Sequence, residues 1–180
     1  MLPSRQPGKA AEYTQAYLAS VSHTDAMIGQ VLDALADSPY AANTTVVLFS
    51  DNGFHLGEEF HWRKRTFWEQ SARVPLLIKS PGNPDYPVGD VTEEVSLLDL
   101  AATVLDLAGQ DPEPQFEGAP LHDAANRSAV EIFLDNGIAT VEAGIKRIDY
   151  DTAVPGLGDR EKYDLASDPM ELTNLIPPGC

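Results

Sequence analysis

The sequence predicts an α/β protein, and the order of its elements carries the prediction. A long amphipathic segment at residues 12–36 is followed by two short apolar runs at 44–49 and 74–78, and a second helical pattern occupies 95–109. The order helix, strand, strand, helix is typical of one half of an α/β sandwich. At 180 residues, the chain can form one well-cored domain, or a large domain with a small appendage.

The first helix is expected from an apolar stripe with steps of three and four residues. The stripe consists of Leu18, Val21, Ile28, Leu32 and Leu35. One gap in the stripe is filled by Asp25. Two interpretations of Asp25 stay open: a buried carboxylate bonded to neighbouring donors, or a group that supports a nearby site. His23 lies beside the stripe and is more typical of a packing residue than of a ligand.

The two apolar runs are interpreted as strands. Residues 44–49 are unbroken in apolar and β-branched side chains, which favours a central parallel strand covered on both faces. The helix at 95–109 has Ser96 at the N-cap position and Asp99 three residues later, and Gly109 marks its end.

The sequence pattern changes after about residue 110, from helical and apolar runs to alternating runs. Two alternating runs flank Asp135-Asn136-Gly137, and Asn-Gly in that setting indicates a type I′ hairpin. In the closing run YDLASDPMELTNL, the positions of Asp168, Pro169 and Glu171 fit N-cap, N1 and N3 of a short helix. The chain is therefore divided into two units, residues 1–109 and residues 110–180.

Composition excludes several classes of protein. With 12 Lys and Arg against 28 Asp and Glu, the net charge of −16 argues against general binding to nucleic acid or anionic lipid. No apolar run approaches the roughly 20 residues of a membrane span. Basic residues near the start have no apolar segment behind them, so no secretory signal is present as written, and localisation stays open. Cys180, the single cysteine, can form no internal disulfide.

A second copy of the tripeptide, Asp51-Asn52-Gly53, directly follows the predicted strand 44–49. Ligands of open α/β sheets bind beyond the carboxyl ends of strands. Adjacent carboxylate and amide oxygens are hard donors suited to Ca²⁺ or Mg²⁺, and Gly53 allows a sharp backbone turn. This copy is therefore a candidate metal site, whereas the copy at 135–137 is interpreted as a turn.

A basic cluster comes next in this acidic chain. It contains His55, His61, Arg63, Lys64, Arg65 and Arg73. One interpretation is a solvated loop that balances its acidic neighbours. The other is an anion site, because a cation beside Lys and His donors would stabilise a tetrahedral oxyanion during ester cleavage at sulfur or phosphorus. A Lys or His could also protonate the leaving oxygen.

Taken together, these runs resemble a known family. YLASVSHTDAMIGQVLDAL, TTVVLFSDNGFHLGE, HWRKRTFWEQSARVPLLIKSPG, VSLLDLAATVLDLAG and YDLASDPMELTNL are similar to the C-terminal portion of sulfatases, in the same order. The iduronate and choline sulfatase branch of the alkaline phosphatase superfamily is the best match. The resemblance implies part of an alkaline-phosphatase-like α/β/α sandwich, with a small C-terminal antiparallel sheet plus helix that serves a structural role.

The resemblance also implies roles for individual residues. Asp51 and Asn52 would ligate calcium, with magnesium as the second choice, and Lys64 would contact the sulfate and its bridging oxygen. His61 would share the catalytic pocket. Substrate contacts are further expected from Arg63 and His55, and Glu58 would help shape the pocket.

The departures from the family pattern are equally specific. The Asp-Asp metal pair of the family's first strand is absent, and so is the C-x-P-S-R or S-x-P-S-R motif whose first residue becomes the formylglycine nucleophile. Leu2-Pro3-Ser4-Arg5 echoes the end of that motif, but Met1 occupies the nucleophile position, so the echo is interpreted as chance. The chain is expected to be a C-terminal fragment, inactive without a missing N-terminal half.

Three functional hypotheses follow. The first is calcium-dependent hydrolysis of a sulfate ester on a small molecule or a glycan. The second is hydrolysis of a phosphoester or phosphonate by a member of the same superfamily. The third is a non-catalytic remnant or a module that binds sulfated glycans.

Overall fold

The computed structural model describes residues 8–111, 113–154 and 158–176. The Leu2–Arg5 echo lies outside these residues. The helical elements are α1 (Lys9–Ala36), η2 (Glu58–Phe60), α2 (Glu69–Ala72), α3 (Asp99–Leu107) and η3 (Leu121–Asn126). The strands are β1 (Val46–Phe49), β2 (His55–Leu56), β3 (Trp62–Arg63), β4 (Leu76–Lys79), β5 (Val130–Leu134), β6 (Gly137–Glu142), β7 (Ile145–Val154) and β8 (Gly158–Asp164).

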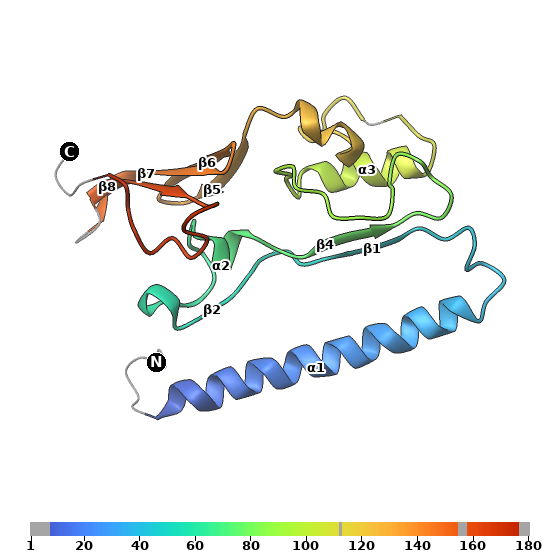
Figure 1. Ribbon diagram of the computed structural model, residues 1–180, viewed down its shortest axis with the longest axis horizontal. Coiled ribbons are helices and arrows are strands. Elements are labelled where there is room, and N and C mark those ends of the chain that lie inside the picture. Colours follow the sequence, from blue (N-terminus) through green and yellow to red (C-terminus); the bar gives the residue numbers. More distant parts are fainter. Residues whose placement is uncertain (1–7, 112, 155–157, 177–180) are drawn as a thin grey trace.

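The N-terminal part is layered as an α/β/α arrangement. Strands β1 and β4 form a central ribbon, with α1 on one side of it and α3 on the other (Figure 1). The prediction of a parallel, doubly covered strand at 44–49 is wrong. β1 pairs antiparallel with β4, and Leu48 and Phe49 are 38% and 49% exposed. An apolar run indicates that a strand can be buried, but it does not indicate whether the neighbouring strand is parallel or antiparallel.

The long helix α1 is confirmed, but its environment is not the predicted one. No residue of Lys9–Ala36, a segment that the structure describes completely, is buried. Asp25 is exposed, so the interpretation as a buried carboxylate is wrong, and His23 is exposed as well. The helix is held by aromatic contacts near its start, where the ring of Tyr17 stacks on Phe54 with centroids 5.0 Å apart.

The second predicted helix is present as α3, and its predicted end at Gly109 is confirmed. Its start is not the predicted one, because the helix begins at Asp99 with Leu98, not Ser96, at the N-cap. The Ser96 amide donates to the Asp99 carboxylate at 2.9 Å, and the Ser96 hydroxyl accepts from the Leu98 amide at 3.2 Å. At the other end, Gly109 has a φ of 68°. The Gln110 amide then donates to the Leu105 carbonyl at 2.9 Å. This bond across the left-handed glycine is characteristic of a Schellman motif.

The C-terminal part is a four-stranded antiparallel sheet in the order β5-β6-β7-β8. The predicted hairpin after β5 is confirmed, but its type is not I′. The register makes Asp135-Asn136 the two-residue loop, and neither residue has a positive φ. The following hairpin has the left-handed pair instead, with φ of 50° at Ala143 and 76° at Gly144.

The short helix predicted to begin at Asp168 is a turn. The Asp168 carboxylate accepts from the backbone amides of Leu172 and Thr173 at 3.1 and 2.8 Å, farther along the chain than the N2 and N3 amides that an N-cap side chain bonds. Glu171 has a φ of 57°, which ends any helical path at that residue. Its side chain is buried and forms an ion pair with Lys146, so tertiary contacts override the local capping pattern.

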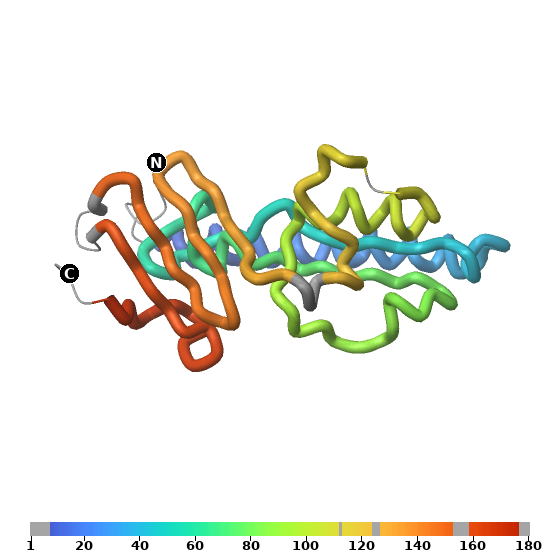
Figure 2. The backbone as a smooth tube through the Cα atoms, turned by 90° about the horizontal axis from the view of Figure 1, so that it is seen from above, coloured from blue at the N-terminus to red at the C-terminus, as the bar shows by residue number. Residues whose placement is uncertain are grey.

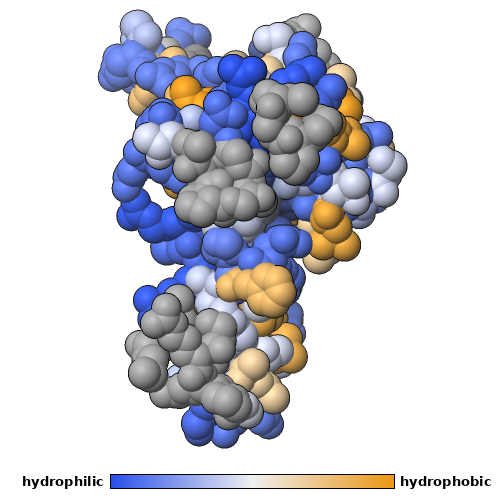
Figure 3. Space-filling view, turned by 90° about the vertical axis from the view of Figure 1, so that its left-hand side faces the viewer, coloured by the Kyte–Doolittle hydropathy of each residue, from blue (hydrophilic) through white to orange (hydrophobic). Residues whose placement is uncertain are grey.

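The main hydrophobic cluster joins the sheet to the segment before α2. It consists of Phe67, Trp68, Ala139, Ile148 and Tyr163. The sheet lies at one end of the long axis, and α3 lies farther along it, over the β1–β4 ribbon (Figures 1 and 2). The end that carries the sheet is mostly hydrophilic (Figure 3), in keeping with the acidic composition. Among the described residues, no helix is long and apolar enough to cross a membrane.

Candidate functional site

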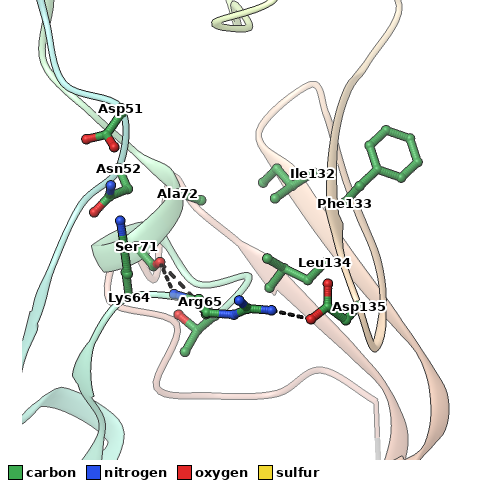
Figure 4. A pocket seen from close by; sticks show the side chains of 11 residues that line it. Asp51, Asn52, Lys64, Arg65, Ser71, Ala72, Ile132, Phe133, Leu134 and Asp135 are labelled. Atoms are coloured by element: carbon green, nitrogen blue, oxygen red, sulfur yellow. Dashed lines mark hydrogen bonds and ion pairs between the residues drawn. The ribbon is translucent and has the colours of Figure 1, made fainter.

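A hollow of about 500 Å³ lies where the end of β1, the segment 64–72 and the β5–β6 hairpin meet (Figure 4). Its lining includes Asp51, Asn52, Lys64, Arg65, Ser71 and Asp135. The side chains of Ile132 and Leu134 form the wall on the sheet side, whereas the ring of Phe133 points away from it (Figure 4). The hollow therefore combines oxygen donors, cationic groups and an apolar wall from two separate parts of the chain.

Asp51 and Asn52 lie directly after β1, as the sequence predicts. The Ser50 hydroxyl donates to the Asn52 carbonyl at 2.8 Å, and the Gly53 amide donates to the Ser71 carbonyl at 2.8 Å. A Cβ atom at Gly53 would lie 2.1 Å from the Gln70 carbonyl oxygen. Gly53 is therefore required by a close approach of two backbone segments, not by the sharp left-handed turn expected from the sequence.

Lys64 lies between two residues with unusual backbone geometry. Arg63 has a φ of 79° and Arg65 a φ of 75°, a backbone conformation that residues other than glycine rarely adopt. The Ser71 hydroxyl accepts from the amides of Arg65 and Thr66 at 3.1 and 3.4 Å, which fixes the chain after Lys64. Such strain persists where surrounding contacts enforce it, and it is concentrated at functional sites.

The second Asp-Asn-Gly contributes to the same hollow. The Arg65 guanidinium forms an ion pair with the Asp135 carboxylate, which projects from the tip of the β5–β6 hairpin (Figure 4). The sequence does not predict Asp135 at this site, because Asp-Asn-Gly between two alternating runs is already explained by a hairpin turn. Nothing in the sequence near Asp135 indicates that its partner lies 70 residues earlier.

Three of the predicted substrate contacts lie outside the lining of the hollow. His55 is fully buried, and its Nε2 lies 2.7 Å from the hydroxyl of Thr66. Burial, and secondarily the charge of His61, lowers the pKa of His55. Arg63 is exposed on β3. The geometry makes His55 a support beneath the Lys64 segment.

His61 lies in an aromatic cluster next to this support. Its ring centroid is 4.8 Å from that of Trp68 and 5.8 Å from that of His55, and its Nδ1 is 2.7 Å from the Glu59 carbonyl oxygen. Glu58, expected to shape the pocket, accepts from the Leu56 amide at 2.6 Å. These two residues organise the loop before Lys64 and do not belong to the lining of the hollow.

Asp51 and Asn52 are the candidate metal ligands of the hollow. In the described ranges, there is no group of three or more His, Cys, Asp or Glu side chains arranged to hold a metal ion. The carboxylate of Asp51 and the amide of Asn52 have the donor chemistry that calcium prefers, but calcium usually takes about 6 to 8 oxygen ligands. The two residues fit calcium as two ligands of a larger set.

Comparison with known proteins agrees with the fold. The family model described as Sulfatase matches residues 3–110. A sulfatase of Formosa agariphila is 35% identical over 97% of this chain and 35% of its own length. A choline-sulfatase of Rhizobium meliloti is 32% identical over 89% of this chain and 32% of its own length. The chain belongs to the sulfatase family, as its sequence motifs predict.

A solved structure shows the same fold. It is described as a complex with its substrate D-glucosamine-2-N,6-O-disulfate, and it superposes with a TM-score of 0.75 at 28% identity. The match covers 93% of this chain and 37% of the solved one. The chain thus spans about a third of the length of the relatives that it matches.

Proposed function

We propose that the chain is the C-terminal part of a sulfuric ester hydrolase that uses calcium. The observation that carries the proposal is the meeting of Asp51, Asn52 and Lys64 in one hollow, in a chain of the sulfatase family. Asp51 and Asn52 supply two calcium ligands, and Lys64 contacts the sulfate group. His61, Arg63 and His55 support the loop that carries Lys64.

The chemistry of this arrangement suits sulfate transfer. A divalent cation and an ammonium group on the same side of a sulfate ester neutralise the charge that develops on its oxygens. Lys64 can also donate a proton to the oxygen of the departing alcohol. The chain itself therefore contributes charge stabilisation and a proton donor to the reaction.

The nucleophile and the remaining calcium ligands belong to sequence outside this chain under the proposal. The printed sequence contains no C-x-P-S-R motif, so formylglycine would come from an N-terminal part. Exposed apolar residues support such a part: Leu18 and Val31 on α1 are 56% and 69% exposed, and Leu77 on β4 is 56% exposed. Another portion of the fold would cover these faces.

The substrate class is a sulfated small molecule or a sulfated glycan. One relative of known structure was solved with a disulfated glucosamine, which supports a sugar. The apolar wall of Ile132 and Leu134 would contact the alcohol part of the ester. A module that binds sulfated glycans without cleaving them is the second candidate, favoured by the absence of the nucleophile motif from the printed sequence.

Calcium titration by calorimetry tests the proposal on the 180-residue chain with sulfate present. The expected result is saturable binding that Asp51→Ala abolishes. Asp90→Ala, which removes an exposed carboxylate from a loop outside the lining of the hollow, is the matched control and should leave binding unchanged. Equal binding by both variants would contradict the assignment of Asp51. No binding at all would mean that the chain alone lacks a metal site.

A further inference from the structure

Two charged side chains of the C-terminal sheet are completely buried. Lys146 on β7 and Glu161 on β8 each have 0% exposure. Charged residues are almost never fully buried unless they are paired, because removing a charge from water is unfavourable unless new partners replace the water. Neither residue belongs to the hollow, so their burial requires a separate explanation.

Lys146 contacts the segment that follows Lys64. Its ammonium donates to the Phe67 carbonyl at 2.9 Å and to the Glu69 carboxylate at 2.7 Å. It also lies 2.9 Å from the Glu171 carboxylate, which in turn accepts from the Glu69 backbone amide at 2.5 Å. The ammonium thus bonds to Phe67 before α2 and to Glu69 at its start, and it pairs with the carboxylate that holds the Glu69 amide.

Glu161 holds the same segment through a side chain. Its carboxylate accepts from the Trp68 indole nitrogen at 2.9 Å, and the hydroxyls of Tyr150 and Tyr163 donate to it at 2.8 and 2.6 Å. Trp68 also packs against His61 with centroids 4.8 Å apart. The residues just before Phe67, from Lys64 to Thr66, line the hollow. Phe67 and Trp68 are themselves 2% and 5% exposed.

We propose that Lys146 and Glu161 are positioning residues for Lys64, acting through the Phe67 backbone and the Trp68 ring. Lys64 lies three residues before Phe67, between the strained Arg63 and Arg65. Strained conformations persist only when their surroundings determine them. The two buried charges supply fixed hydrogen bonds on the side opposite the hollow. The inference rests on the proposed function, in which Lys64 contacts sulfate.

Lys146→Met and Glu161→Gln test the inference in the full chain. Arg147→Met is the matched control, because Arg147 is the next residue on β7 and is exposed. Hydrogen exchange of amides 64–69 should become at least about tenfold faster in the two buried variants and stay unchanged in Arg147→Met. A merely structural role would instead accelerate exchange throughout the sheet and the β1–β4 ribbon alike.

Sulfate affinity provides the second readout. Lys146→Met should weaken sulfate binding about fivefold or more when Lys64 is present and have no further effect in a Lys64→Ala background. Should Lys146→Met fail to fold, Lys146→Met combined with Glu171→Gln removes one of the two carboxylates left without a partner and is measured instead.

The outcomes separate the inference from the proposed function. Unchanged exchange at 64–69, or equal weakening with and without Lys64, overturns the inference, while the effect of Lys64→Ala on sulfate binding still supports the proposed function. If the unaltered chain binds no sulfate and Lys64→Ala changes nothing, the proposed role of Lys64 fails, and the positioning role fails with it.

Discussion

Replacing Gly53 by alanine tests how the hollow is built. The new methyl carbon would lie 2.1 Å from the Gln70 carbonyl oxygen, whereas real Cβ contacts stay beyond 3.0 Å. The contacted atom belongs to the backbone and cannot rotate away, so the segments that carry Gly53 and Gln70 would have to separate by about 1 Å. This separation would break the bond of 2.8 Å from the Gly53 amide to the Ser71 carbonyl.

The expected cost follows from these two effects. Overpacking costs roughly 1–3 kcal/mol and the lost hydrogen bond about 0.5–1.5 kcal/mol, so Gly53→Ala should lower the free energy of unfolding by about 2–4 kcal/mol. The displacement should also abolish calcium binding, because Asp51 and Asn52 lie just before Gly53. Urea unfolding followed by circular dichroism measures the first effect, and calorimetry the second.

Two other glycines serve as controls. Gly118→Ala meets backbone equally closely, 2.1 Å from the Leu98 carbonyl oxygen, but far from the hollow, so it should destabilise the chain without affecting calcium. Gly29→Ala lies in α1 with open space around it and should stabilise by roughly 0.5–1 kcal/mol. If Gly53→Ala behaved like Gly29→Ala, the proposed close approach would be refuted.

Three further predictions concern other contacts. Burial lowers the pKa of His55, so below about pH 6.5 the unfolded chain binds a proton at this residue that the folded chain does not bind, and the free energy of unfolding should fall on acidification. In thermal melts at several pH values, His55→Gln should lose this pH dependence of stability, and His23→Gln should keep it. A double-mutant cycle on the exposed Arg65–Asp135 pair should give a coupling of about 0.2–1 kcal/mol that disappears in roughly 1 M salt. Ala143→Asn should stabilise by roughly 0.5–1 kcal/mol in urea unfolding, because Asn tolerates the left-handed φ; a loss would contradict the turn assignment.

Local patterns predicted local structure well. The steps of three and four in α1, the Ser96–Asp99 pair and Gly109 each act within one turn of helix, and each is confirmed. The sulfatase resemblance, which rests on the order of several motifs, is confirmed by the family match over residues 3–110. The division after residue 109 stays a prediction.

Features that depend on distant partners could not be predicted in this way. Glu171 fits a capping position in sequence, yet its carboxylate pairs with Lys146, 25 residues earlier, and the predicted helix does not form. β1 has the apolar composition of a strand that is buried on both faces, but its actual burial depends on which elements pack against those faces. Asp51, Asn52 and Lys64 line one hollow and come from neighbouring motifs, whereas Asp135 comes from a distant hairpin that no local pattern links to them. The roles of these residues stay a prediction.

The two Asp-Asn-Gly copies show why the C-terminal sheet is more than a structural appendage. The first copy places Asp51 and Asn52 at the hollow through a glycine that permits close backbone approach, and the second places Asp135 there through a hairpin tip. The same sheet contacts the segment after Lys64 through hydrogen bonds from Lys146 to the Phe67 carbonyl and from the Trp68 indole to Glu161. Since one wall of the hollow and the rear support of its cationic loop come from residues 130–164, a change in the packing of the sheet must alter the position of Lys64 relative to Asp51.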